Sequence, residues 1–113
     1  FLKNKIASSS MTVPIPDGST VDLTIDITKE TTIEEINNLL KNYSENDLKN
    51  IIGITYDPIV SSDVVRSTFS GLIDGLATMG INNKKIKLII WFDNGWGYAS
   101  RIIDTIKRLG QEL

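Results

Sequence analysis

The chain has 113 residues, of which 41% are hydrophobic and 23% are charged, with a formal net charge of -2. This length is that of one small domain, and this composition is that of an ordinary globular protein, which excludes a disordered tail. No apolar run approaches the roughly 20 residues of a membrane-spanning helix, and no basic block is present, so we expect neither membrane nor nucleic-acid binding.

Cysteine and histidine are both absent. The chain alone therefore cannot supply the nucleophile of a cysteine protease, the base of a Ser–His hydrolase or a metal site built from these side chains, and we expect no catalytic residue and no metal ligand in it. It starts at Phe1, without an initiator methionine or the pattern of a signal peptide. We therefore expect a processed chain or a part of a longer protein.

The first 27 residues predict a loop followed by two strands. Met11–Ile15 has strand-forming residues, but the nearby prolines reduce it to an edge or irregular strand. Residues 19–27 alternate between apolar and polar side chains, which predicts a strand with one buried face. On its polar face, Asp22 and Asp26 are either a carboxylate pair for acid–base chemistry or, in the interpretation that we favour, solvated charges.

A helix is predicted from Thr31 or Thr32 to about Tyr43. Either threonine completes a capping box with the glutamate three residues later, and apolar side chains then recur on one helical face. The short β-branched stretch 51–56 predicts a buried strand. Residues 61–63, Ser-Ser-Asp, predict a turn or a helix cap, and without histidine they do not form a nucleophile.

The second half of the chain predicts more strands and a closing helix. Residues 69–81 are ambiguous, because their apolar residues have helical spacing while their glycines, and the hairpin turn predicted at 82–83, favour a strand. Residues 86–92 are nearly all apolar and predict a central strand buried on both faces. An amphipathic helix is predicted over 99–109, with Gly110 as the residue that follows its end.

Together these segments predict an α+β fold with five or six strands and two helices. Their order is strand, strand, helix, three strands and helix. We expect a mixed, mostly antiparallel sheet with the helices on one face, formed as a single unit over residues 1–113. No glycine-rich strand-to-helix turn of a dinucleotide-binding fold lies within these residues.

The stretch 91–98 joins the last predicted strand to the last helix. It holds both tryptophans of the chain, two glycines, a tyrosine and Asn94 within eight residues. Two interpretations fit this composition: a corner whose rings fill the core, or a place where the backbone comes close to a ligand. For Asn94, residue type alone favours a helix N-cap.

Five blocks of the chain carry a common resemblance. They are residues 13–24 (VPIPDGSTVDLT), 48–55 (LKNIIGIT), 60–63 (VSSD), 74–79 (DGLATM) and 92–98 (FDNGWGY). In this order and spacing they resemble the C-terminal part of the catalytic domain in the glyceraldehyde-3-phosphate dehydrogenase family, whose closing signature is W-Y/F-D-N-E-W/F-G-Y-S. The resemblance extends over essentially the whole chain and corresponds to roughly the last third of a family polypeptide. It favours strand for the ambiguous segment before the hairpin.

The resemblance implies roles for three residues. Asn94 matches the family asparagine that holds the carboxamide of the nicotinamide in NAD or NADP, a task that suits an amide because it is both donor and acceptor. Tyr98 matches the tyrosine that flanks the nicotinamide ring. Thr12 stands where the family has an arginine that binds substrate or inorganic phosphate, and a hydroxyl cannot replace a guanidinium there. Gly95 stands where the family usually has glutamate.

The resemblance also implies what this chain lacks. In the family the nucleophilic cysteine, its activating histidine and the dinucleotide-binding domain precede this region, so the chain alone cannot oxidise an aldehyde. We expect a portion of a phosphorylating, NAD(P)-dependent dehydrogenase of glycolysis or carbon fixation, completed by the rest of the same polypeptide or by a companion chain. The resemblance further implies that the sheet of this chain builds a subunit interface in a homotetramer, and it favours the cytoplasm over an organelle.

The alternative is a non-catalytic relative that serves as a structural subunit of a larger assembly. The replaced arginine and glutamate motivate it, together with the missing catalytic residues. In both cases we expect the chain by itself to expose strand edges and apolar faces, and therefore to aggregate or to need a partner.

Overall fold

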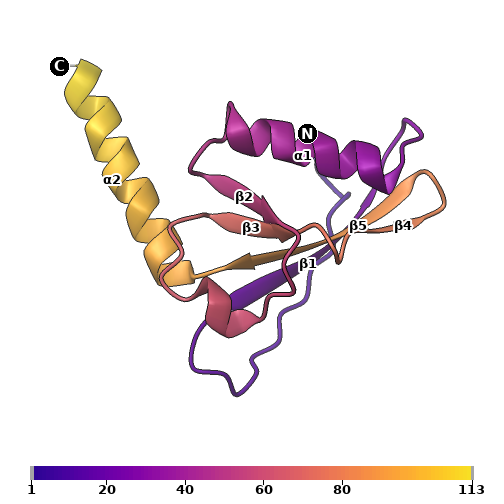
Figure 1. Cartoon of the computed structure of the whole chain (residues 1–113), viewed down its shortest axis with the longest axis horizontal. Helices are drawn as coiled ribbons and strands as arrows, with labels where there is room; N and C mark the ends of the chain where they lie inside the picture. Colours follow the sequence, from indigo (N-terminus) through magenta and orange to yellow (C-terminus); the bar gives the residue numbers. More distant parts are fainter. Residues whose placement is uncertain (1, 113) are drawn as a thin grey trace.

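The computed structural model describes residues 2–112 and has an α+β fold (Figure 1). Its elements, in chain order, are β1 (Ser19–Asp26), α1 (Ile33–Glu45), β2 (Ile52–Thr55), the 3-10 helix η1 (Ser61–Val64), β3 (Gly71–Asp74), β4 (Met79–Ile81), β5 (Lys85–Phe92) and α2 (Asn94–Glu112). The predicted fold class is confirmed, since one mixed sheet of five strands and two α-helices make up the described part of the chain.

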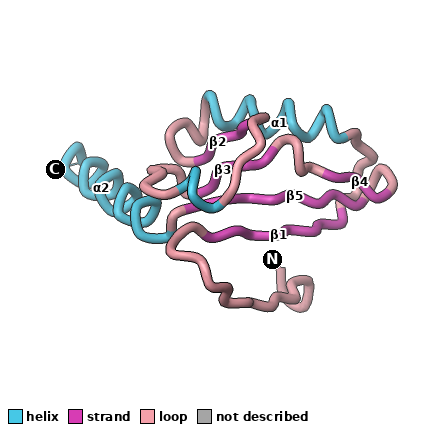
Figure 2. Tube along the Cα trace, turned by 60° about the horizontal axis from the view of Figure 1, so that its bottom comes forward, coloured by secondary structure: helices cyan, strands magenta, loops and turns pink. Residues whose placement is uncertain are grey.

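Strand β5 is the centre of this sheet (Figure 2). β1 runs antiparallel to it along its whole length, from Ser19 opposite Phe92 to Asp26 opposite Lys85. On the other side of β5, β3 and β4 follow one another and are also antiparallel to it. β2 extends the sheet beyond β3 and makes the one parallel pair among the strands of residues 2–112. The sheet is therefore mostly antiparallel, as predicted.

The two faces of β5 differ in burial. Ile86 and Leu88, which face apolar residues of β1, are buried at 1% and 6% exposure. The prediction that this strand is buried on both faces is wrong for the chain as it stands, because Lys85 and Lys87, on the other face, are only partly buried, with side-chain exposures of 38% and 31%.

The polar face of β1 supplies the partners of these lysines. Asp26 lies 2.6 Å from the Nζ atom of Lys85, and Asp22 lies 2.7 Å from that of Lys87. All four side chains are partly or largely exposed, so the two aspartates are solvated charges, as we favoured, and not a pair set up for acid–base chemistry.

Helix α1 begins with the predicted capping box, and Thr32 is its N-cap. The Glu35 N–H donates to the Thr32 hydroxyl at 3.1 Å, and the Thr32 N–H donates back to the Glu35 carboxylate at 2.9 Å. The helix lies beside β2 (Figure 1). Its buried Asn37 donates to the Gly75 carbonyl at 3.0 Å and accepts from the Thr78 hydroxyl at 2.8 Å, which fixes the helix to the turn between β3 and β4.

Two predicted strands differ from the structure. Met11–Ile15 forms no strand, since the prolines at 14 and 16 cannot donate to a ladder. The ambiguous segment 69–81 is indeed β-structure, as its context and the family resemblance favoured, but it is split into β3 and β4. The Asp74 carboxylate makes the break by accepting the N–H groups of Leu76 and Ala77 at 3.1 and 3.0 Å.

The predicted ends of the last helix are also wrong. Helix α2 starts at Asn94, five residues earlier than its apolar periodicity indicates, and continues through Gly110 to Glu112. Gly110 has open space around it and takes part in the helix, so it is not the residue that follows the helix end. From the end of β5, α2 extends away from the sheet (Figures 1 and 2).

Candidate functional site

The corner between β5 and α2 is built around the carboxylate of Asp93, which is only 2% exposed. Its Oδ1 atom accepts the N–H groups of Gly95 at 2.9 Å and Trp96 at 2.8 Å, and its backbone carbonyl accepts the first hydrogen bond of the helix. These are the contacts of an N-cap. The prediction that Asn94 caps the helix is therefore wrong, because the residue before it already satisfies the free N–H groups of the first turn.

A third donor reaches the same carboxylate from far along the chain. The N–H of Arg66 donates to the Oδ2 atom of Asp93 at 2.8 Å. Arg66 has a φ of 64°, in the left-handed region that non-glycine residues seldom occupy. The loop between η1 and β3 thus takes an uncommon backbone conformation at the residue that contacts the corner.

These three hydrogen bonds set the charge state of Asp93. They hold its pKa below the ordinary value of 3.8, with the N–H of Trp96 having the largest effect, while burial acts in the opposite direction. The carboxylate is therefore ionised at neutral pH. Its negative charge lies at the positive end of the α2 dipole, which favours the docked helix.

The backbone of α2 also packs directly on the segment before β3. Gly97 is buried, and a Cβ atom added there would lie 2.7 Å from the carbonyl oxygen of Phe69. That separation is too short for any side chain, so only glycine allows the helix to approach this closely.

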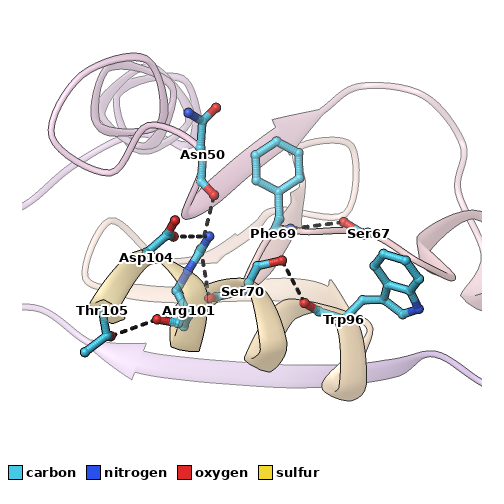
Figure 3. A network of polar contacts seen from close by, with 9 residues as sticks. Asn50, Ser67, Phe69, Ser70, Trp96, Arg101, Asp104 and Thr105 are labelled. Atoms are coloured by element: carbon cyan, nitrogen blue, oxygen red, sulfur yellow. Dashed lines mark hydrogen bonds and ion pairs between the residues drawn. The ribbon is translucent and has the colours of Figure 1, made fainter. Parts of the chain in front are cut away.

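Arg101 makes the third link between α2 and the sheet (Figure 3). Its Nη1 atom donates to the carbonyl of Asn50 at 3.1 Å and to the hydroxyl of Ser70 at 3.3 Å, and its Nη2 atom lies 2.7 Å from the Asp104 carboxylate. The guanidinium thus joins the helix to the starts of β2 and β3. We call Asp93, Gly97 and Arg101, with the 66–70 segment that they contact, the α2 seat.

Asn94 and Tyr98 lie together on an open side of this seated helix. They are four residues apart in α2, which places them on the same helical face one turn from each other. Both are exposed, Tyr98 to 70%. Within residues 2–112 neither side chain has a hydrogen-bond partner, so the amide and the phenol are both available to a ligand.

The third predicted site residue lies elsewhere. Thr12 is exposed in the irregular segment that leads into β1. Among the described residues, no hydrogen bond joins it to the β5–α2 corner. The structure therefore brings Asn94 and Tyr98 together and leaves Thr12 on a separate element.

Sequence reasoning missed the residues of the α2 seat. For Asp93 the residue type was a signal, because aspartate is a strong N-cap candidate, but the apolar periodicity placed the start of the helix at residue 99, too far from Asp93. No local pattern indicates that Gly97 lies against Phe69 or that Arg101 reaches Ser70, since each partner is about 30 residues away in the chain.

Residues 2–112 contain no group of three or more acidic side chains placed to hold a metal ion. Neither helix in the same range has the length and apolar character needed to cross a membrane.

Comparison with known proteins extends the sequence resemblance. Residues 1–94 match the family model described as glyceraldehyde 3-phosphate dehydrogenase, C-terminal domain. The chain is 46% identical over 110 residues to the glyceraldehyde-3-phosphate dehydrogenase of Borreliella burgdorferi. The matched residues are 96% of this chain and 33% of that protein. It is 47% identical over 92 residues to the glyceraldehyde-3-phosphate dehydrogenase of Thermotoga maritima, and this match covers 81% of this chain and 28% of that protein.

A third relative is matched over similar fractions of its own length and of this chain. The Geobacillus stearothermophilus glyceraldehyde-3-phosphate dehydrogenase is 44% identical over 103 residues, covering 91% of this chain and 31% of that protein. The chain therefore spans about a third of the length of the curated relatives that it matches.

Proposed function

Because this chain belongs to the glyceraldehyde-3-phosphate dehydrogenase family, we propose that it is the C-terminal portion of the catalytic domain of a phosphorylating, NAD(P)-dependent enzyme. In the complete enzyme a cysteine outside this chain would attack the aldehyde of glyceraldehyde 3-phosphate. A bound dinucleotide would supply the hydride acceptor, and the acyl group would leave on inorganic phosphate. The task of this chain would be to orient the nicotinamide.

The pairing of Asn94 with Tyr98 on one open face of α2 carries this proposal. Asp93 caps the helix, which leaves the Asn94 amide without a partner among residues 2–112. Its carbonyl can accept from the nicotinamide carboxamide and its NH2 group can donate to it. Tyr98, one turn further along, offers an aromatic ring to the flank of the nicotinamide.

The remaining length of α2 supports a covered position in a larger protein. Its apolar residues Ile102, Ile103, Ile106 and Leu109 are exposed by 44% to 62%. A contiguous apolar helix face of this kind marks a contact surface. We propose that the rest of the polypeptide, or a companion chain, covers it, and that the assembly is a homo-oligomer.

The test uses the intact polypeptide purified from its source. We expect a mass well above that of 113 residues, and formation of NADH or NADPH that depends on glyceraldehyde 3-phosphate and inorganic phosphate. The variant Asn94→Asp, which removes the amide donors at constant size, should weaken dinucleotide binding about five- to tenfold, since one hydrogen bond to such a group contributes about 1 to 1.5 kcal/mol. A complete assembly without any activity, or an Asn94→Asp variant with unchanged binding, would contradict the proposal.

The second candidate function is a non-catalytic structural subunit. Two departures from the family pattern favour it, Thr12 in place of arginine and Gly95 in place of glutamate. Intact-mass analysis separates the two functions. A polypeptide of this chain's own length that purifies without a companion would favour the structural subunit.

A further inference from the structure

Asn94 and Gly95 form the one Asn-Gly dipeptide of the chain. In such a pair the backbone nitrogen of glycine can attack the Cγ atom of asparagine, because glycine has no side chain to hinder the approach. The N–Cγ bond forms, the Cγ–Nδ2 bond breaks, and ammonia leaves with the proton of the glycine N–H. Water then opens the succinimide ring to give aspartate or isoaspartate.

In the folded protein, the structure of the β5–α2 corner hinders the reaction of both the Gly95 nitrogen and the Asn94 side chain. The Gly95 N–H is engaged with the Oδ1 atom of Asp93 at 2.9 Å, so its nitrogen is not free to attack. Asn94 is the first residue of α2, and its helical backbone must rotate before the Gly95 nitrogen can come in line with the Cγ atom. The reaction therefore requires the first turn of the helix to open.

We propose that Asn94 is a site of spontaneous deamidation that is gated by the docking of α2. The amide persists while Asp93, Gly97 and Arg101 hold the helix on the 66–70 segment, and it converts to a carboxylate when this seat opens. Since local opening and closing precede the slow chemical step, the rate follows the population of the open state.

The consequence for cofactor binding rests on the proposed function. An amide offers both a donor and an acceptor, whereas the carboxylate that replaces it only accepts. Isoaspartate in addition lengthens the backbone at the start of the helix. Deamidated protein should therefore bind NAD or NADP more weakly. Opening of the α2 seat would in this way lead to permanent loss of the cofactor contact.

The experiment compares the intact polypeptide, folded and unfolded in urea, during incubation at neutral pH in water enriched in oxygen-18. Peptide mass spectrometry follows conversion at Asn94 and, as an internal control, at the exposed Asn38, which precedes leucine. We expect Asn94 to convert faster than Asn38 in the unfolded protein. In the folded protein we expect its rate to fall more than about tenfold, which needs an opening free energy of only about 1.4 kcal/mol.

Two variants and a urea titration test the lability of the dipeptide and the protection that the α2 seat gives it. Gly95→Ala should suppress conversion in the unfolded state, and the structure tolerates it because the added Cβ atom would lie 3.4 Å from the nearest atom, Oδ1 of Asp93. Arg101→Ala should raise the folded-state rate about tenfold. If that variant does not fold, urea below the global unfolding transition should raise the rate in the wild-type protein.

Each outcome is decisive. Equal rates in the folded and unfolded protein would show that the seat gives no protection, and an unfolded Asn94 no faster than Asn38 would show that the dipeptide is not labile. A rate unaffected both by Arg101→Ala and by mild urea would overturn the gating. Dinucleotide affinity of the aged protein is measured separately, so conversion without loss of affinity would count against the proposed function and leave the modification site standing.

Discussion

The backbone N–H of Arg66 lies 2.8 Å from the Oδ2 atom of Asp93, across 27 residues of sequence. The other oxygen of the same carboxylate caps helix α2. One buried side chain therefore fixes the loop before β3 and the start of the helix relative to each other. The position of Asn94 and Tyr98, in the first turns of the helix, therefore depends on this loop.

The first prediction concerns pH and Asp93. Its pKa is lowered in the folded state, so the unfolded state takes up a proton first as the pH falls toward the ordinary value of 3.8. The stabilisation is present above that value and is lost as the pH drops through the lower folded-state pKa. Urea unfolding of the intact polypeptide between pH 7 and pH 3 should therefore show a steeper decline for the wild type than for Asp93→Asn.

Asp47→Asn is the control for this measurement. Asp47 is exposed in the turn after α1, and no hydrogen bond or ion pair to its carboxylate lies within residues 2–112. Asp47→Asn removes one negative charge, as Asp93→Asn does, but no hydrogen bond, so it separates the loss of charge from the loss of the three contacts to Asp93. An Asp93→Asn variant with an unchanged slope would show that the three N–H groups do not stabilise the charged carboxylate.

The second prediction contrasts two glycines of the same helix. Gly97→Ala should destabilise the docked helix by about 1 to 3 kcal/mol, because its Cβ atom would lie 2.7 Å from the Phe69 carbonyl oxygen and the two segments would have to move apart. Gly110→Ala meets nothing within 4 Å and should stabilise α2 by up to about 1 kcal/mol through helix propensity. Equilibrium unfolding of both variants measures the difference. Equal shifts of the same sign would be inconsistent with close packing at residue 97.

The third prediction separates the two roles of the Arg101 guanidinium. Arg101→Ala removes the hydrogen bonds to Asn50 and Ser70 and should destabilise α2 by about 1.5 to 3 kcal/mol. Asp104→Ala removes only the ion pair, whose acidic partner is 53% exposed, and should cost at most about 1 kcal/mol. Amide hydrogen exchange along α2 reports both effects. Faster exchange in the aspartate variant than in the arginine variant would reverse this assignment.

The parts of the fold that sequence predicts well are set by short-range chemistry. The capping box at Thr32 and the alternation of β1 each need only a few neighbouring residues. The division of residues 69–81 into two strands could not be predicted from spacing alone. The apolar residues have helical spacing, whereas the Asp74 carboxylate stabilises a turn between the strands.

The candidate site was predictable only in part. Family resemblance selected Asn94 and Tyr98, but residue type alone favoured Asn94 as the cap. Asparagine and aspartate are about equally good N-caps. The choice of Asp93 is reinforced by the Arg66 N–H from a distant loop, and such a contact leaves no trace in the local pattern.

The last prediction concerns Thr12, which we propose occupies a weakened phosphate subsite in the complete enzyme. Thr12→Arg should lower the KM for glyceraldehyde 3-phosphate or for inorganic phosphate about tenfold or more, since a bidentate charge-assisted contact contributes about 1.5 to 3 kcal/mol. Steady-state assays of the intact polypeptide measure this, with Ser10→Arg as the matched control, because Ser10 is exposed in the same stretch and gains the same charge. A general rise in positive charge would act equally from both positions. A lower KM in both variants would therefore indicate long-range attraction, and an unchanged KM in Thr12→Arg would show that phosphate is held by residues outside this chain.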